Sequence, residues 1–158
     1  MKQEKPGTFL SACLNTGAIV TLTLMVTIVT AQVVMRYVFH HSLSWAEEAA
    51  RFLLVWVAFL GTIIGLQRKE HISVDAFVSM LPHTIRGVVT AISIVITALF
   101  WTFLGWGGLG LWRSAADQVS PAMQLPMSWV YAIIPISGLV LLLISLDHLR
   151  QLFRPKGK

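Results

Sequence analysis

The sequence has little charge for its length. Asp, Glu, Lys and Arg together make up 12% of its 158 residues, while hydrophobic residues make up 56%. An ordinary soluble domain has roughly 25% charged residues. A soluble domain this small keeps much of its surface in water and could not bury so much apolar side chain. The composition therefore predicts a single membrane domain, residues 1–158, whose main solvent is lipid.

Cysteine is nearly absent. The one cysteine, Cys13, has no partner in the chain. This excludes an internal disulfide, a metal site built from several cysteines and the cysteine pairs that a quinone-linked thiol oxidase needs. Because Cys13 lies in an apolar run, we expect a buried structural thiol.

Charge is missing over four stretches, residues 6–35, 52–67, 87–112 and 118–146. A helix that crosses a bilayer needs roughly 20 residues. The second stretch is short, but Ser44 and Glu47 form a capping-box pattern that starts its helix earlier. In the fourth, Pro126 suits a first helical position, and Pro135 should kink the helix. We predict an all-α integral membrane protein with four transmembrane helices, over residues 9–35, 45–67, 84–112 and 126–146.

Short segments complete the prediction. We expect an interfacial helical segment over residues 75–81. The first apolar stretch far exceeds the hydrophobic core of a signal peptide, roughly 7–15 residues, and no clear small-residue cleavage site ends it. We therefore expect it to be a retained helix.

The basic residues indicate the orientation. The N-terminal tail, the second loop and the C-terminal tail hold nine of the twelve Lys and Arg residues, and the opposite side holds three. Because cytoplasmic flanks carry the excess of Lys and Arg, both termini are predicted to be cytoplasmic. The net charge of +5 fits flanks that face anionic membrane lipids. The sequence has no patch in which aromatic residues alternate with basic ones, so it does not indicate nucleic-acid binding.

No Asp, Glu, Lys, Arg or His lies in the central part of any predicted span. Ionisable groups at that depth mark proton relays, ion sites and substrate pathways. Their absence argues against a proton-coupled small multidrug carrier, which needs a buried carboxylate, and against a four-helix haem protein, which needs histidines within its helices. We expect no cofactor, no metal, no substrate-binding residue on this chain and no enzymatic activity.

Small residues form patterns within the spans. Gly61 and Gly65 make a GxxxG pair with Ala58 on the same side, which lets helix backbones approach closely in lipid. Threonines line one face of the first helix at residues 16, 23, 27 and 30. These features fit either packing among the chain's own helices or docking of a second membrane subunit. The glycine run over 105–110 has no strand before it, so it indicates loosened helix packing rather than a phosphate loop.

Two polar clusters remain. Four charged side chains lie in the first loop and at the start of the helix after it, where they could neutralise one another: Arg36, Glu47, Glu48 and Arg51. Exposed pairs of this kind contribute little stability. In the second loop the side chains capable of binding a metal are Glu70, His71 and Asp75. Three ligands on a short loop are more often structural than a metal site.

Three segments together resemble one family. They are RYVF…SLSWAEE…RF over residues 36–52, RKEHISVD over 68–75, and LPMSWVY over 125–131 leading to Pro135. Their order is similar to that of the small membrane subunit, of DctQ type, of tripartite ATP-independent periplasmic (TRAP) transporters. The resemblance covers residues 14–149.

The resemblance implies a function that composition does not show. TRAP transporters import organic acids, usually carboxylates such as C4-dicarboxylates or sialic acid, across the bacterial inner membrane. A periplasmic protein binds the substrate, and a large membrane subunit of about a dozen spans carries the sodium and substrate sites. The small subunit is expected to brace the large one. The residues assigned by this resemblance and by the GxxxG pattern to subunit interface or loop architecture are Arg36, Glu47, Glu48, Arg51, Gly61, Gly65, Glu70, His71 and Asp75. The alternative is a self-associating four-helix protein that forms its own small channel.

Overall fold

The described part of the chain is helical. The computed structural model describes residues 9–67 and 83–153. Its helices are α1 Phe9–Tyr37, α2 Ser44–Gln67, α4 His83–Ser114, α5 Met127–Tyr131 and α6 Ile133–Phe153. Within these two ranges the extended pairing is limited to one isolated bridge, between Val119 and Pro126. The predicted all-α class is confirmed.

Four stretches of helix are long and apolar enough to cross a membrane. They are Ser11–Tyr37, Ser44–Gln67, Ile85–Ser114 and Met127–Leu152. α1 and α4 continue two residues beyond the ends of their predicted spans and include Arg36 and Arg113, and α6 continues seven residues, to Phe153. Hydropathy marks only the apolar part of a helix, whereas the backbone stays hydrogen-bonded into the headgroup region. The number of spans agrees with the sequence prediction.

The last crossing is interrupted at Ala132, between α5 and α6. Pro135 lies four residues after Tyr131. Its ring leaves no N–H for the Tyr131 carbonyl and crowds that carbonyl. The flanking hydrogen bonds persist, from Ala132 N to the Ser128 carbonyl (2.9 Å) and from Ile136 N to the Ala132 carbonyl (3.4 Å). The irregularity predicted for Pro135 therefore falls one turn before the proline.

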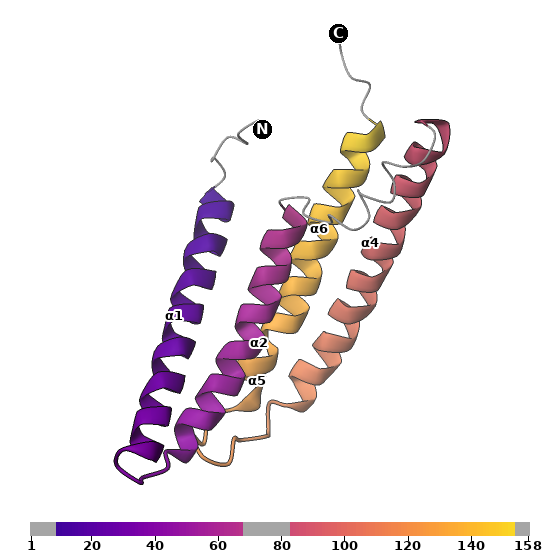
Figure 1. Ribbon diagram of the computed structural model, residues 1–158. Coiled ribbons are helices and arrows are strands. Elements are labelled where there is room, and N and C mark those ends of the chain that lie inside the picture. The colour runs from indigo at the N-terminus through magenta and orange to yellow at the C-terminus, as the bar shows by residue number, and fades with distance from the viewer. Residues whose placement is uncertain (1–8, 68–82, 154–158) are drawn as a thin grey trace.

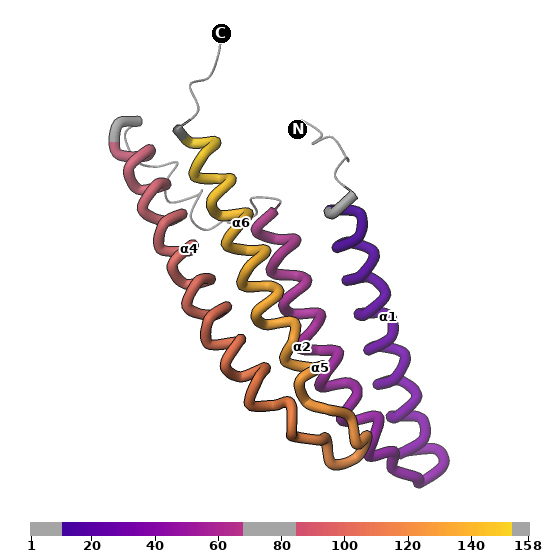
Figure 2. The backbone as a smooth tube through the Cα atoms, turned by 180° about the vertical axis from the view of Figure 1, so that it is seen from behind, coloured from indigo at the N-terminus to yellow at the C-terminus, as the bar shows by residue number. Residues whose placement is uncertain are grey.

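The helices form an open row rather than a closed bundle. Figures 1 and 2, seen from opposite sides, both show the order α1, α2, α6, α4. Among the described helices, α1 contacts α2 only, and α4 contacts α6 and the short α5. Successive long helices run in opposite directions, so the start of α1 and the end of α6 lie at the same end of the row (Figure 1). α1 and α4 are consequently the two edges.

The buried core is small and belongs to the middle of the row. Ile63 and Leu66 of α2 pack with Leu141 of α6. Half-buried neighbours of this cluster are Leu14, Trp101, Val140 and Ile144. In the most apolar windows of α1 and α4, the share of buried residues is zero. Most of the apolar surface of the described helices must therefore be covered by lipid or by another protein.

α4 and α6 approach most closely at glycines. A Cβ added to Gly138 would lie 2.6 Å from the Cα of Gly105, and one added to Gly108 would lie 2.6 Å from Cγ2 of Ile134. Gly105 and Gly108 belong to the run for which loosened packing was predicted. That prediction is wrong: these two glycines make the tight contact with α6, because the absence of a side chain lets the backbones meet.

Gly61 and Gly65 have a different surrounding. A Cβ added to either would meet nothing within 4 Å. They do not pack against another described helix of this chain. Packing among the chain's own helices, one of the two explanations for the GxxxG pair, is therefore not observed. Cys13 is exposed, which contradicts the expected buried thiol; it lies on α1, the edge helix with a single neighbour.

Candidate functional site

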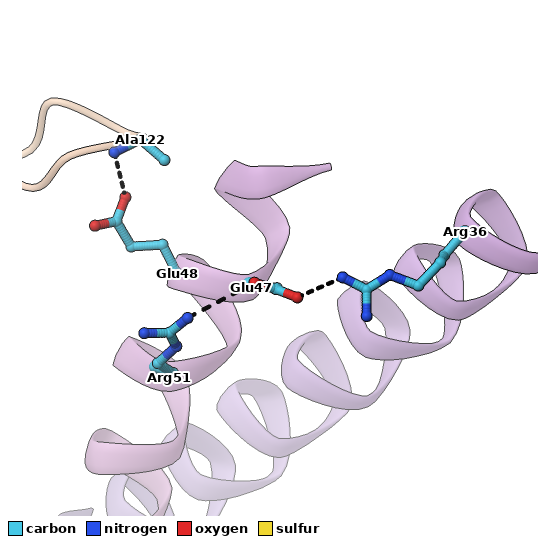
Figure 3. Close-up of polar contacts among 5 residues, drawn as sticks. All are labelled: Arg36, Glu47, Glu48, Arg51 and Ala122. Atoms are coloured by element: carbon cyan, nitrogen blue, oxygen red, sulfur yellow. Dashed lines mark hydrogen bonds and ion pairs between the residues drawn. The ribbon is translucent and has the colours of Figure 1, made fainter. Parts of the chain in front are cut away.

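Glu47 lies between two arginines where α1 passes into α2. Nη2 of Arg36, near the end of α1, donates to Oε1 of Glu47 at 2.7 Å. Nη2 of Arg51, one turn along α2, lies 3.7 Å from Oε2 of Glu47. Figure 3 shows the carboxylate bridging the two guanidinium groups. The bridge links the end of α1 to the first turns of α2.

The loop between these helices positions that bridge. Val38 N donates to the Val34 carbonyl at 2.8 Å and His41 N to the Met35 carbonyl at 3.0 Å, which closes the end of α1. His40 has a φ of 51°, in the left-handed region where the chain reverses. The Glu47 carboxylate meets arginines on both of its oxygens, rather than reaching back over the helix start as the capping-box pattern predicts.

The ion pairs at Glu47 are open to solvent or headgroups. The side chains of Arg36 and Glu47 are 48% and 39% exposed, and that of Arg51 is 76% exposed. Exposed pairs contribute only about 0–1 kcal/mol. Their role is therefore to orient the α1–α2 connection, or to meet a partner, more than to stabilise the fold.

Glu48 accepts hydrogen bonds from backbone amides instead of joining the predicted ion network. Its Oε2 accepts hydrogen bonds from the backbone N–H groups of Ala122, at 3.0 Å, and Met123, at 2.8 Å. Figure 3 shows its side chain turned away from Glu47 and toward Ala122. Hydrogen bonds from amides to a carboxylate are charge-assisted and stronger than neutral ones. Glu48 thus ties the start of α2 to the loop before α5.

That loop is a compact turn built around Ser120, which is fully buried. Ser120 N donates to the Leu125 carbonyl at 2.9 Å, and Leu125 N donates to Ser120 Oγ at 3.2 Å. Met127 N donates to the Gln118 carbonyl at 2.8 Å. Sequence reasoning missed Ser120 and the two amides; in this segment it singled out only Pro126, as a first helical position.

An open face runs along α2 beyond this network. Four exposed residues are spaced three and four apart, Arg51, Leu54, Ala58 and Gly61, and the exposed Thr62 lies beside Gly61. Thr62 Oγ1 donates to the Ala58 carbonyl at 2.8 Å, so its hydroxyl proton is already used within the helix. Because helices pack most closely over Gly and Ala, this face can accept another helix at short range.

The predicted second-loop residues Glu70, His71 and Asp75 lie outside the described residues. Within residues 9–67 and 83–153, no group of three or more His, Cys, Asp and Glu side chains is placed to hold a metal. The structure thus brings Arg36, Glu47 and Arg51 together and gives Glu48 separate partners. It leaves Gly61 on the open face and Gly65 half-buried one turn further along α2.

Residues 25–155 match the family described as tripartite ATP-independent periplasmic transporters, DctQ component. The chain belongs to the DctQ family. The resemblance found in its three motifs is confirmed, and the fold of four apolar helices agrees with it. As a DctQ-family chain, it is a multi-pass protein of the bacterial inner membrane and a component of a transporter, not an enzyme.

Individual relatives are similar over different lengths. A putative TRAP transporter small permease protein of Haemophilus influenzae is 27% identical over 141 residues, covering 89% of this chain and 88% of the relative. The C4-dicarboxylate TRAP transporter small permease protein DctQ of Vibrio cholerae is 29% identical over 83 residues, covering 52% of this chain and 36% of the relative.

A third relative is much longer than this chain. The sialic acid TRAP transporter permease protein SiaT of H. influenzae is 26% identical over 116 residues, which are 73% of this chain and 19% of SiaT. The DctQ-family chain therefore spans about a fifth of that permease. In SiaT, a segment similar to this chain is covalently joined to the rest of the protein.

Proposed function

We propose that this chain is the non-catalytic small permease subunit of a sodium-coupled TRAP importer of an organic acid, and that it braces the scaffold of a large membrane subunit. One observation carries the proposal: the four helices form an open row with almost no buried surface at its edges. A row of this kind encloses no pathway of its own but offers two broad apolar faces to a partner.

The chemistry of the helices supports the same role. No ionisable side chain lies in the central part of the four helices, where sodium sites or substrate carboxylates would need polar partners. The sites for sodium and substrate are therefore assigned to the large subunit, and capture of the substrate to a periplasmic binding protein. Relatives name sialic acid and C4-dicarboxylates, which are the substrate classes proposed here.

The orientation follows from the basic flanks, with both termini in the cytoplasm. The Glu47 bridge and the Glu48 contact then lie at the periplasmic end, where α1 meets α2 and α4 meets α5. We assign Arg36, Glu47, Glu48 and Arg51 to loop architecture at that end. Gly61 and Gly65 are assigned to a subunit interface.

The second-loop residues are assigned by the motif alone. Glu70, His71 and Asp75 are proposed to serve the cytoplasmic loop or an interface, as the family resemblance implies. Because the three side chains lie in the predicted cytoplasmic loop, their replacement should affect assembly before it affects substrate capture in the periplasm.

Reconstitution tests the function. The chain is tagged and expressed with the large subunit of the proposed transporter, and the complex is purified in mild detergent. We expect co-purification of the large subunit, and uptake into proteoliposomes that requires an inward sodium gradient, both membrane subunits and the binding protein. Equal uptake without this chain would refute the bracing role.

The same purification distinguishes the alternative function. The exposed threonines of α1 and the open face of α2 would also suit self-association into a small channel. A monodisperse homo-oligomer that conducts ions, with no larger partner, would favour the channel and overturn the transporter assignment.

A further inference from the structure

The outer edge of α1 carries a regular line of exposed residues. Spaced alternately four and three apart, they are Thr16, Val20, Thr23, Thr27, Thr30 and Val34. Val20 is 59% exposed and Val34 is 43% exposed. The alternation of three and four keeps residues on one side of a helix that packs against a neighbour in a left-handed crossing. We call these six residues the threonine edge.

The opposite side of α1 has the same spacing and is already occupied. Its half-buried residues are Leu14, Ala18, Thr21, Met25, Ile28 and Gln32. Because α1 contacts only α2 among the described helices, this side must face α2. Thr23 precedes Met25 by two residues, and two residues correspond to roughly 200° around an α-helix. The threonine edge therefore points away from α2, out of the row.

The other edge of the row differs chemically. On α4 large exposed side chains form a line, Ile85, Val88, Ile92, Leu99, Phe103 and Trp106, and the small exposed residues beside it are Gly87, Thr102, Gly107 and Gly110. Phe103 is 77% exposed and Trp106 81% exposed. Bulky apolar residues suit contact with lipid chains, whereas helix contacts in membranes are enriched in Gly, Ala, Ser and Thr. Of the two edges, that of α1 is the one suited to a protein helix.

The hydroxyl of Thr27, in the middle of the threonine edge, is compatible with close packing. Thr27 Oγ1 donates to the Thr23 carbonyl at 2.8 Å. With its proton used inside the helix, Thr27 presents a methyl group and an oxygen that can still accept a hydrogen bond. At Thr27 the surface is therefore small, stiff at χ1 and without an unsatisfied donor that would disfavour an apolar partner.

We propose that the threonine edge of α1 docks a transmembrane helix of the large permease subunit, which extends the row by one helix. The proposal rests on the proposed function and names the surface it uses. The threonine edge has the same residue spacing as the side of α1 that packs against α2. A spacing that serves one helix–helix contact of α1 can therefore serve a second one. SiaT, in which a segment like this chain is 19% of one polypeptide, favours the rest of a permease over a second copy as the neighbour.

Photo-crosslinking in the assembled complex tests this assignment. A benzophenone amino acid replaces Thr23 in one variant and Phe103 in a matched variant on the α4 edge, both within the full complex in membranes. We expect irradiation of the Thr23 variant to give an adduct between this chain and the large subunit, severalfold stronger than from the Phe103 variant. A stronger adduct from Phe103, an adduct between two copies of this chain, or no protein adduct from Thr23 in an intact complex would each overturn the proposal.

A packing variant gives an independent readout. Thr23→Leu combined with Thr27→Leu adds bulk to the threonine edge, and Ile92→Phe combined with Leu99→Phe adds bulk to the α4 edge as the control. We expect only the threonine variant to reduce, severalfold, the large subunit recovered per tagged chain, with unchanged helicity of this chain. Equal recovery for both variants would contradict the docking role.

The experiments distinguish failure of the proposed function from failure of the proposed docking surface. If the unmodified chain recovers no large subunit at all, the proposed function fails. If it recovers the large subunit and supports uptake but the Thr23 variant gives no adduct with it, only the docking surface is wrong.

Discussion

Replacing Gly138 by Ala should push α4 and α6 apart. The new Cβ would lie 2.6 Å from the Cα of Gly105, 2.9 Å from Gly105 N and 3.2 Å from the Trp101 carbonyl oxygen. All three are backbone atoms, so no rotamer change can relieve the contact. Ordinary contact begins at 3.4 Å, so the closest pair must separate by 3.4 − 2.6 = 0.8 Å.

The magnitude follows from two opposing effects. Overpacking of a well-packed contact costs about 1–3 kcal/mol, whereas Ala in place of Gly in a helix interior gains about 0.5–1 kcal/mol. Gly61→Ala has the second effect alone, because nothing lies within 4 Å of its added Cβ. The free energy of unfolding of Gly138→Ala should therefore be about 1–3 kcal/mol below that of Gly61→Ala.

A second control lies across the same contact. A Cβ on Gly105 would be 3.5 Å from the Cα of Gly138, an ordinary distance, so Gly105→Ala should be tolerated although it touches the same helix pair. Unfolding of the purified chain in mixed micelles, followed by circular dichroism as the denaturing detergent is increased, measures all three variants. Equal stability of Gly138→Ala and Gly105→Ala would refute the reasoning.

Three further changes test the polar network and the open face. Glu48→Ala removes the acceptor for the Ala122 and Met123 amides, of which the first is exposed and the second part-buried, at about 0.5–1.5 kcal/mol, so hydrogen exchange at these two amides should become faster; unchanged exchange would contradict the assigned contact. Glu47→Ala breaks pairs that are 39–76% exposed, so the stability of the isolated chain should fall by no more than about 1 kcal/mol, while recovery of the large subunit falls. Gly61→Leu should leave helicity intact but reduce co-purification of the large subunit, and the sodium dependence of the remaining uptake should not change; altered sodium coupling with normal assembly would argue against the bracing role.

Hydropathy was sufficient to predict the four crossings, because charge-free runs of this length leave few other folds. The ends of the helices were less predictable. Arg36 and Arg113 continue the helices beyond the apolar runs, because the headgroup region tolerates charge. The kink was expected at Pro135, but the helix is interrupted one turn earlier, at Ala132, because the carbonyl that loses its donor is that of Tyr131, four residues before the proline.

The side-chain contacts were predictable only where they are local. Glu47 and Arg51 are one turn apart on one helix, so their pairing follows from the spacing. The amide partners of Glu48 lie 74 and 75 residues away, and no pattern links them. The glycines show the same limit: Gly61 and Gly138 both permit close approach, but only the rotation of each helix in the row decides which one has a neighbour.

The spatial order of the row bears on how the protein is made. Of the described helices, α6 leaves the ribosome last, and it lies between α2 and α4, whose backbones make no contact within the described residues. Until α6 enters the membrane, the growing chain is therefore a helical hairpin of α1 and α2, and α4 is joined to it by the polypeptide and by the hydrogen bonds between Glu48 and the loop after α4. Insertion of α6 joins the two parts, so a chain that stops before α6 should leave α4 surrounded by lipid and available to quality-control proteases.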